Sequence, residues 1–130
     1  MALCAGLVGD RTNQQKYEKL AATLKAKLET TFWNASKQAL VHNSINGVQS
    51  DAVTRYANMF SVFFNYLTSE KQQAIKHSVL LNDSILKITT PYMRFYELEA
   101  LCALGEQETV MQEMKAYWGG MLKEGATSFW

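Results

Sequence analysis

Apolar residues recur every three or four positions in five stretches of this sequence, and this spacing constrains the chain to helices packed on one another. The clearest stretch spans residues 13–32, where one helical face would carry Tyr17, Leu20, Leu24 and Leu28. The other predicted helices span residues 51–67, 69–81, 91–104 and 107–118. Because the chain has a single proline and no long alternation of apolar and polar residues, we predict an all-α fold with about five main helices.

Several predicted helix ends carry characteristic capping residues. Thr90 followed by Pro91 is the strongest start signal, because proline at the first helical position lacks only an N–H that would have no helical partner. Gly105 predicts the end of that helix in a left-handed conformation. Residue 50 or 51 is the expected cap of the second helix. The glycine pair that follows residue 118 is expected to end the fifth.

The connections between the predicted helices alternate in length. Long connections span residues 34–50, 82–90 and 119–130, and short ones lie at 68 and 105–106. In a stack of antiparallel helical hairpins, this alternation would gather the long connections at one end. The helices at 51–67 and 91–104 also carry fewer charges for their length, 5 in 31 residues against 13 in 46 for residues 13–32, 69–81 and 106–118, so they should be buried on more sides. Both patterns describe an inner and an outer layer, as in an α/α toroid, although periodicity alone suits an ordinary helical bundle equally well.

Composition restricts the classes of function. The net charge is +1 and no basic stripe is present, which argues against a nucleic-acid surface. No apolar run approaches membrane-spanning length, and the first ten residues are too brief for a signal peptide, so no compartment is predicted. The two cysteines, Cys4 and Cys102, are far apart in sequence and are read as free buried thiols rather than metal ligands or a disulfide.

Three segments resemble bacterial α-L-rhamnosidases of glycoside hydrolase family 78. These segments are TPYMRFYELEALCALG at 90–105, YWGGML at 117–122 and GATSFW at 125–130. Their order and separation also fit that family. Residues 13–33 resemble the preceding outer helix more weakly, so the resemblance covers most of the chain while its specific motifs lie in residues 90–130.

The resemblance implies part of a catalytic six-hairpin α/α barrel that hydrolyses terminal α-L-rhamnose with inversion. Inversion needs an acid and a base, two carboxyl groups about 6.5–9.5 Å apart. In the family, the base is a glutamate directly after the motif that ends here at Trp130, and the acid lies in an earlier hairpin. We therefore expect residues 1–130 to be a single partial domain, a C-terminal barrel fragment. It would hold no catalytic residue and no cofactor or metal site, and it would be inactive alone.

Five residues near the predicted long connections are candidates for contacting a sugar. Trp130 would lie against the apolar C–H face of a sugar ring, and Thr127 would orient the neighbouring carboxylate. Tyr92, Gln49 and His42 would face the sugar and its hydroxyl groups. Structural alternatives remain open: packing between hairpins for Trp130, a helix cap for Thr127, a core position for Tyr92 and a solvated loop for His42.

The carboxylates inside the chain are not expected to form a catalytic pair. Glu97 and Glu99 lie two residues apart on one predicted helix, so they should face different directions. Glu124 matches no catalytic position of the family and is expected to be exposed.

Two other functions fit the same sequence. The chain could be a complete small helical interaction domain without enzymatic activity, in which Phe129 and Trp130 pack in its own core. It could also belong to another six-hairpin glycosidase, such as one acting on glucosides. The expected partner of the parent enzyme is a carbohydrate, a rhamnoside. The isolated chain is expected to self-associate through the exposed surface of its inner helices.

Overall fold

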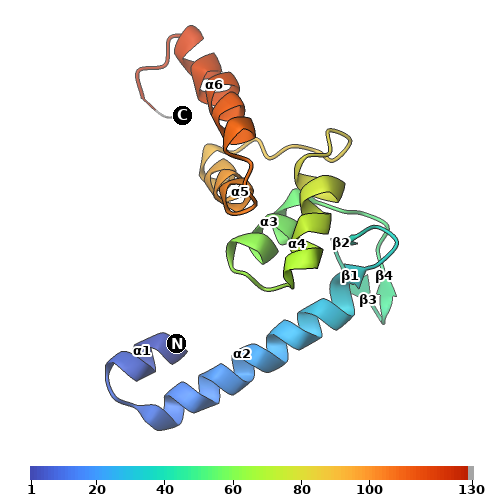
Figure 1. Cartoon of the computed structure of the whole chain (residues 1–130), viewed down its shortest axis with the longest axis vertical. Coiled ribbons are helices and arrows are strands. Elements are labelled where there is room, and N and C mark those ends of the chain that lie inside the picture. Colours follow the sequence, from blue (N-terminus) through green and yellow to red (C-terminus); the bar gives the residue numbers. More distant parts are fainter. Residues whose placement is uncertain (129–130) are drawn as a thin grey trace.

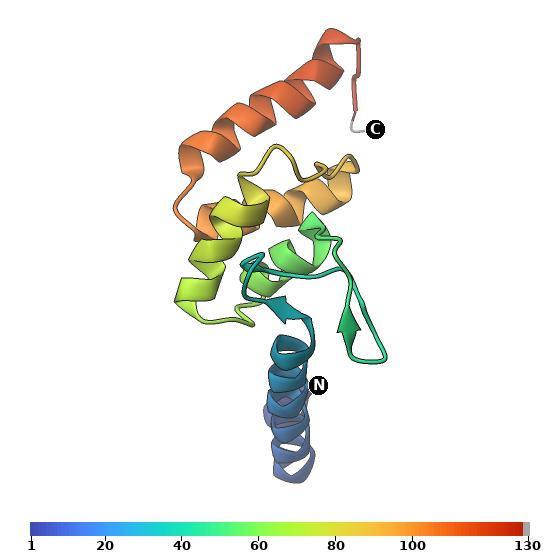
Figure 2. The same ribbon diagram turned by 90° about the vertical axis from the view of Figure 1, so that its right-hand side faces the viewer.

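The computed structural model describes residues 1–128 and shows a stack of helices with two short β hairpins (Figures 1 and 2). In chain order, the elements are α1 (Ala2–Leu7), α2 (Arg11–Phe32), β1 (Trp33–Asn34), β2 (Ala39–Leu40), β3 (Ser44–Ile45), β4 (Val48–Gln49), α3 (Arg55–Phe63), α4 (Ser69–Ile75), the π-helix η1 (Lys76–Leu80), α5 (Pro91–Ala103) and α6 (Gln107–Lys123). The five predicted helices correspond to α2, α3, α4 with η1, α5 and α6. The all-α prediction is confirmed.

The long connections lie at one end of the helical stack. In Figure 2, α3 and α5 begin on the right, where the β3–β4 hairpin and the end of α6 also lie. The helices α4 and α6 begin on the left, next to the short connections 64–68 and 104–106. The helices therefore form antiparallel hairpins, as predicted. We call the right-hand end, with connections 33–54, 81–90 and 124–128, the rim.

The helices α3 and α5 form the inner layer of the stack. Their buried residues are Arg55, Asn58, Met59, Ser61 and Val62 in α3, and Arg94, Glu97, Leu98, Ala100 and Leu101 in α5. By contrast, α4 buries only Ile75 and α6 only Val110. The low charge of the two inner helices thus predicted their place correctly.

The face that α3 buries differs in part from the one that periodicity predicts. Periodicity over residues 51–67 predicts an apolar face with Tyr56, Phe60 and Phe64, widened by Met59 and Val62. Met59 and Val62 are buried, but Tyr56 and Phe64 are exposed. The buried face instead includes Arg55 and Asn58, whose polar groups are hydrogen-bonded inside the protein. A hydrophobic pattern does not detect such residues, because it counts polar side chains as solvent-facing.

Residues 33–54 hold two antiparallel β hairpins that the sequence analysis missed. Asn46 and Gly47 join β3 to β4 with φ of 52° and 81°, the left-handed pair that a two-residue hairpin turn favours. An Asn-Gly pair is the sequence signal for this turn, but strands of two residues are too short to show alternation. The chain is still extended at Thr54, so α3 begins at Arg55, and the cap predicted at residue 50 or 51 is wrong.

Helix α6 continues through Gly119 and Gly120 to Lys123, so the predicted break at the glycine pair is wrong. Each glycine weakens a helix by about 1 kcal/mol relative to alanine, a cost that neighbouring contacts can offset. Trp118 packs against the core next to this pair. By contrast, Gly105 ends α5 with φ of 84°, as predicted.

Alanine substitutions at Gly119 and Gly105 should change the free energy of unfolding in opposite directions. We expect Gly119→Ala to raise the free energy of unfolding by about 0.5–1 kcal/mol, because the added Cβ meets no atom within 4 Å and lies in a helix. Gly105→Ala should lower it by about 1–2 kcal/mol, because an L-residue is strained at this positive φ. Urea unfolding of both variants checks the pair, and equal signs would contradict the fold at one of the two sites.

The helices α1 and α2 form an arm that projects from the stack (Figure 1), and no residue of either helix is buried. Leu20 and Leu24 remain 49% and 56% exposed, so the predicted burial of this face is wrong along most of α2. Only Leu28 and Phe32, near its C-terminal end, pack against the core. The arm therefore presents an apolar helical face that the rest of the described chain does not cover.

Candidate functional site

The exposed residue Tyr92 lies in the first turn of α5, where this helix begins at the rim. Its side chain is 69% exposed, so the expectation of a buried core tyrosine does not describe it. Its hydroxyl lies 3.0 Å from that of Tyr96, one turn further along the helix. The hydrogen bond with Tyr92, together with partial burial, raises the pKa of Tyr96. Two phenol groups thus stand side by side at this end of α5.

Thr127 follows the turn that closes α6. Gly125 makes this turn with φ of 87°, and Ala126 behind it is buried. Thr127 is exposed and lines a depression of about 270 Å³ together with Trp118 and Met121. Its hydroxyl is therefore accessible from solvent. The candidate Trp130 and its neighbour Phe129 lie outside the described residues.

Gln49 and His42 both belong to the connection 33–54, but their side chains differ in availability. The Gln49 amide nitrogen donates to the carbonyl oxygens of Thr31 and Trp33, at 3.0 Å each. The amide of Asn34 donates to Gln49 Oε1 at 2.9 Å, so Gln49 braces β4 against the end of α2. A sugar contact by Gln49 would have to replace one of these bonds. His42 is exposed beside an apolar cavity of about 220 Å³.

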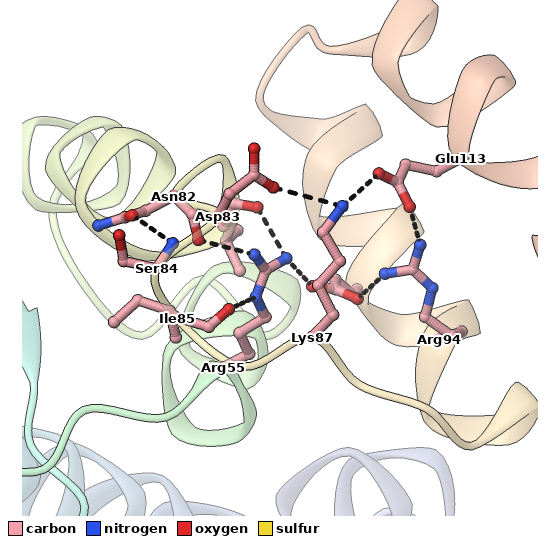
Figure 3. Close-up of polar contacts among 10 residues, drawn as sticks. Arg55, Asn82, Asp83, Ser84, Ile85, Lys87, Arg94 and Glu113 are labelled. Carbon is pink, nitrogen blue, oxygen red and sulfur yellow. Dashed lines mark hydrogen bonds and ion pairs between the residues drawn. The ribbon is translucent and has the colours of Figure 1, made fainter. Parts of the chain in front are cut away.

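A buried arginine holds the connection 81–90 at the rim (Figure 3). Arg55, the first residue of α3, donates to the backbone carbonyl oxygens of Leu80 at 2.9 Å, Asn82 at 2.9 Å and Ile85 at 3.3 Å. The side chain of Asn82 in turn accepts from the N–H of Ser84 at 2.9 Å. One side chain therefore fixes the path of the chain between η1 and α5.

The guanidinium of Arg55 also begins a chain of alternating charges (Figure 3). Glu97 of α5 accepts from Arg55 Nη1 at 2.6 Å and, with its other oxygen, from Arg94 Nη1 at 2.5 Å. Arg94 donates to Glu113 of α6, which also pairs with Lys87 at 3.0 Å. Arg55, Arg94 and Glu97 are all buried, so these ion pairs link α3, α5 and α6 inside the protein.

This network was not predicted from the sequence. Only the different directions of Glu97 and Glu99 were predicted, and this is confirmed, since Glu97 is fully buried and Glu99 is exposed. Arg55 and Arg94 were not identified as partners of Glu97. The available signal was a glutamate on a predicted inner helix with an arginine three residues earlier, a spacing that places both on one side. Arg55 comes from another helix, and local spacing cannot reveal it.

Glu113 makes the stability of this network depend on pH. Burial alone would raise its pKa, but the hydrogen bond from Lys87 and the charge of Arg94 outweigh burial, so its pKa lies below the ordinary 4.5. A carboxyl group with a lowered pKa in the folded state stabilises the fold above its unfolded-state pKa. This stabilisation is lost as pH falls through the folded-state pKa.

We therefore expect Glu113→Gln to destabilise the chain most at neutral pH, where the carboxylate is charged. The difference from the unchanged protein should shrink as pH falls below about 4. Urea unfolding at a series of pH values measures both curves. Glu108→Gln, an exposed position earlier on α6, is the control and should show a smaller effect at every pH. If the difference in the free energy of unfolding between Glu113→Gln and the unchanged chain stays the same at every pH, the lowered pKa of Glu113 is contradicted.

The cysteines and the acidic residues form no metal centre among residues 1–128. Both thiols are free, but Cys4 is exposed and Cys102 is only partly buried, which corrects the expected burial. In the same part of the chain, the helices are too short or too polar to cross a membrane.

The crystal structure of a GH78-family rhamnosidase from Bacillus sp. GL1 is similar to this chain with a TM-score of 0.86. The similarity covers 97% of this chain. This chain shares its fold with part of a GH78 helical barrel. Sequence identity is 22%, and the chain spans 13% of the length of that rhamnosidase. No protein-family model and no curated protein matches the sequence. The predicted fold, antiparallel helical hairpins of an α/α toroid, is thereby confirmed.

Proposed function

We propose that this chain forms part of the catalytic toroid of a glycoside hydrolase that acts on rhamnosides, and that its rim contributes to the sugar site. The observation that carries the proposal is the similarity to a GH78-family rhamnosidase over 97% of the chain, connections included. The three rim connections lie at one end of the stack, which is where loops on a rigid scaffold carry chemistry. The sequence motifs at 90–105 and 117–130 support the same family.

The rim would bind a sugar through groups that solvent can reach. Tyr92 offers a hydroxyl and an aromatic face, and Thr127 offers a hydroxyl. The connection 81–90 leads directly into α5, so Arg55 would position Tyr92 indirectly by fixing that connection. His42 remains a proposed contact at the same end. Trp130, which lies outside the described residues, also remains a proposed sugar contact.

The carboxylates of the charge network, Glu97 and Glu113, are not suited to be the acid or the base of hydrolysis. Glu97 is fully buried and paired with two arginines, so it can neither protonate a leaving group nor activate a water. Glu113 is likewise paired with a lysine and an arginine. We therefore propose that the acid and the base belong to other parts of a parent enzyme. Purified residues 1–130 should release no nitrophenol from a nitrophenyl α-L-rhamnoside.

The proposed binding site is tested by titrating the chain with L-rhamnose and, in parallel, with D-glucose, while NMR monitors the backbone amides. We expect L-rhamnose to shift amides of the rim. Tyr92→Phe should weaken binding about 2–10-fold, the worth of one hydrogen bond. Tyr17→Phe is the matched control, because Tyr17 lies on α2 in the arm that projects from the stack.

Two results would contradict the proposed site. D-glucose could shift the same amides with equal affinity, which would remove the preference for rhamnose. Alternatively, Tyr17→Phe could weaken binding as much as Tyr92→Phe, which would place the sugar away from the rim.

A further inference from the structure

The helical stack has two open ends, and both expose apolar surface. The first end is the arm, where Leu20 and Leu24 of α2 stand exposed one turn apart. Lys16 and Lys27 lie three or four residues from these leucines, so they flank the same face. This end is an apolar ridge with basic edges.

The second end is a groove between α5 and α6. The groove measures about 760 Å³, and its walls include Phe95, Leu98, Val110, Met114 and Trp118. The carboxylate in its wall is Glu99, which is exposed and makes no ion pair with any residue in 1–128. This end is an apolar channel with an acidic edge, a shape that an apolar helical ridge can fill.

The two ends also differ in charge. Residues 1–32 contain five basic and three acidic side chains. In residues 91–124, Glu97, Glu106 and Glu113 are paired with basic side chains, which leaves three acidic side chains (Glu99, Glu108 and Glu124) against two lysines (Lys115 and Lys123). Like ends brought together would place charges of one sign against each other, which disfavours a symmetric contact. Unlike ends would attract one another and would bring the lysines of α2 toward Glu99.

We propose that the isolated 130-residue chain associates head to tail, with the apolar face of α2 in one copy lying in the α5–α6 groove of the next copy. Each copy then keeps one free ridge and one free groove, so the contact is heterologous and can extend beyond a dimer. The proposal rests on the fold and the surface alone. Its test is independent of whether the rim binds a sugar.

The test uses two variants that each block one end. Leu20→Glu/Leu24→Glu blocks the ridge, and Met114→Glu blocks the groove. All three side chains are about half exposed, at 49%, 56% and 45%, so the fold should tolerate the changes. Leu86→Glu is the matched control, because Leu86 is 89% exposed in the connection 81–90, outside both ends. Circular dichroism spectra confirm that every variant is folded.

Sedimentation equilibrium then measures mass against concentration. The unchanged chain and Leu86→Glu should form species larger than a dimer as concentration rises, and added salt should weaken them. Each blocked variant alone should associate about 30-fold or more weakly, the usual effect of losing central contact residues. An equimolar mixture of the two blocked variants should form a dimer and nothing larger, because one intact ridge meets one intact groove.

A second variant tests the charge argument without changing apolar surface. Lys16→Glu/Lys27→Glu should weaken association of the folded chain at low salt and should lose most of its effect at high salt. The proposal is overturned if the unchanged chain stays monomeric, or if either blocked variant associates as the unchanged chain does. A mixture that shows no dimer, while the unchanged chain associates, also overturns it.

Discussion

Replacing Glu97 by glutamine should lower the free energy of unfolding by about 3–5 kcal/mol, a large part of the stability of a domain of this size. Glu97 is fully buried and neutralises two arginines, Arg55 and Arg94, which are also buried. Glutamine has the same shape but no charge, so Arg55 would keep its backbone carbonyl partners but no carboxylate, and Arg94 would keep Glu113. An uncompensated buried charge costs far more than the net value of the ion pair it once formed.

Urea or thermal unfolding measures this loss. The matched control is Glu99→Gln, the same substitution two residues away on an exposed position, which should change stability by no more than about 0.5 kcal/mol. Hydrogen exchange should also show faster opening of the connection 81–90 in Glu97→Gln, because Arg55 anchors it. A loss under about 1 kcal/mol would mean that water reaches this network and that it does not hold the three helices together.

The second large effect is expected for Asn58→Leu, with a loss of about 2–4 kcal/mol. Asn58 is fully buried in α3 and makes both kinds of hydrogen bond with β2. Its amide oxygen accepts from the N–H of Leu40 at 2.8 Å, and its amide nitrogen donates to the carbonyl of Leu40 at 2.9 Å. The same nitrogen donates to the carbonyl of Thr54 at 2.8 Å. Leucine has a similar size but would leave these backbone groups buried without partners, at about 1–3 kcal/mol each.

Denaturant unfolding gives the overall loss, and the amide of Leu40 gives a local readout. This amide should exchange slowly in the unchanged chain and much faster in Asn58→Leu. Asn43→Leu serves as the control, because Asn43 is exposed in the same connection. If both variants lose equal stability, the bridge between α3 and β2 is not what stabilises residues 33–54.

The outline of this fold could be predicted from the sequence because its helix ends carry local signals. Thr90-Pro91 and Gly105 mark both ends of α5, and the structure places the helix at Pro91–Ala103. The alternation of connection lengths depends only on finding the helices, so small errors in their bounds do not disturb it. The inner position of α3 and α5 was predicted from their small number of charged residues for their length.

The parts that could not be predicted depend on contacts between distant residues. The buried face of α3 carries Arg55 and Asn58, which are stable inside only because Glu97 and Leu40 meet them there. The extension of α6 past its glycines depends on packing that overrides propensity. The apolar face of α2 was predicted to be buried, but it is exposed. An amphipathic pattern shows that a face can be buried, but it does not show whether another element covers it.

The places of Tyr92 and Thr127 in the fold are set by signals near them in sequence, and both are exposed as a binding role requires. Their contact with a sugar stays a proposal. The bonds of Gln49 to Thr31 and Trp33 could not be predicted from sequence, because they depend on how β4 meets the end of α2. The network that holds the rim combines residues from three helices and was not predicted, although local spacing offered a signal for the pair on α5.

Hydrogen exchange of the chain with and without L-rhamnose tests most directly whether the rim is a sugar site. With rhamnose bound, we expect slower exchange in the rim connections and in the first turn of α5, because a bound sugar would order these segments together. We expect no change in the short connections 64–68 and 104–106 at the opposite end. Slower exchange only at that opposite end, or only in the α1–α2 arm, would contradict a sugar site at the rim. The absence of any change at rhamnose concentrations that shift the NMR signals would also contradict it.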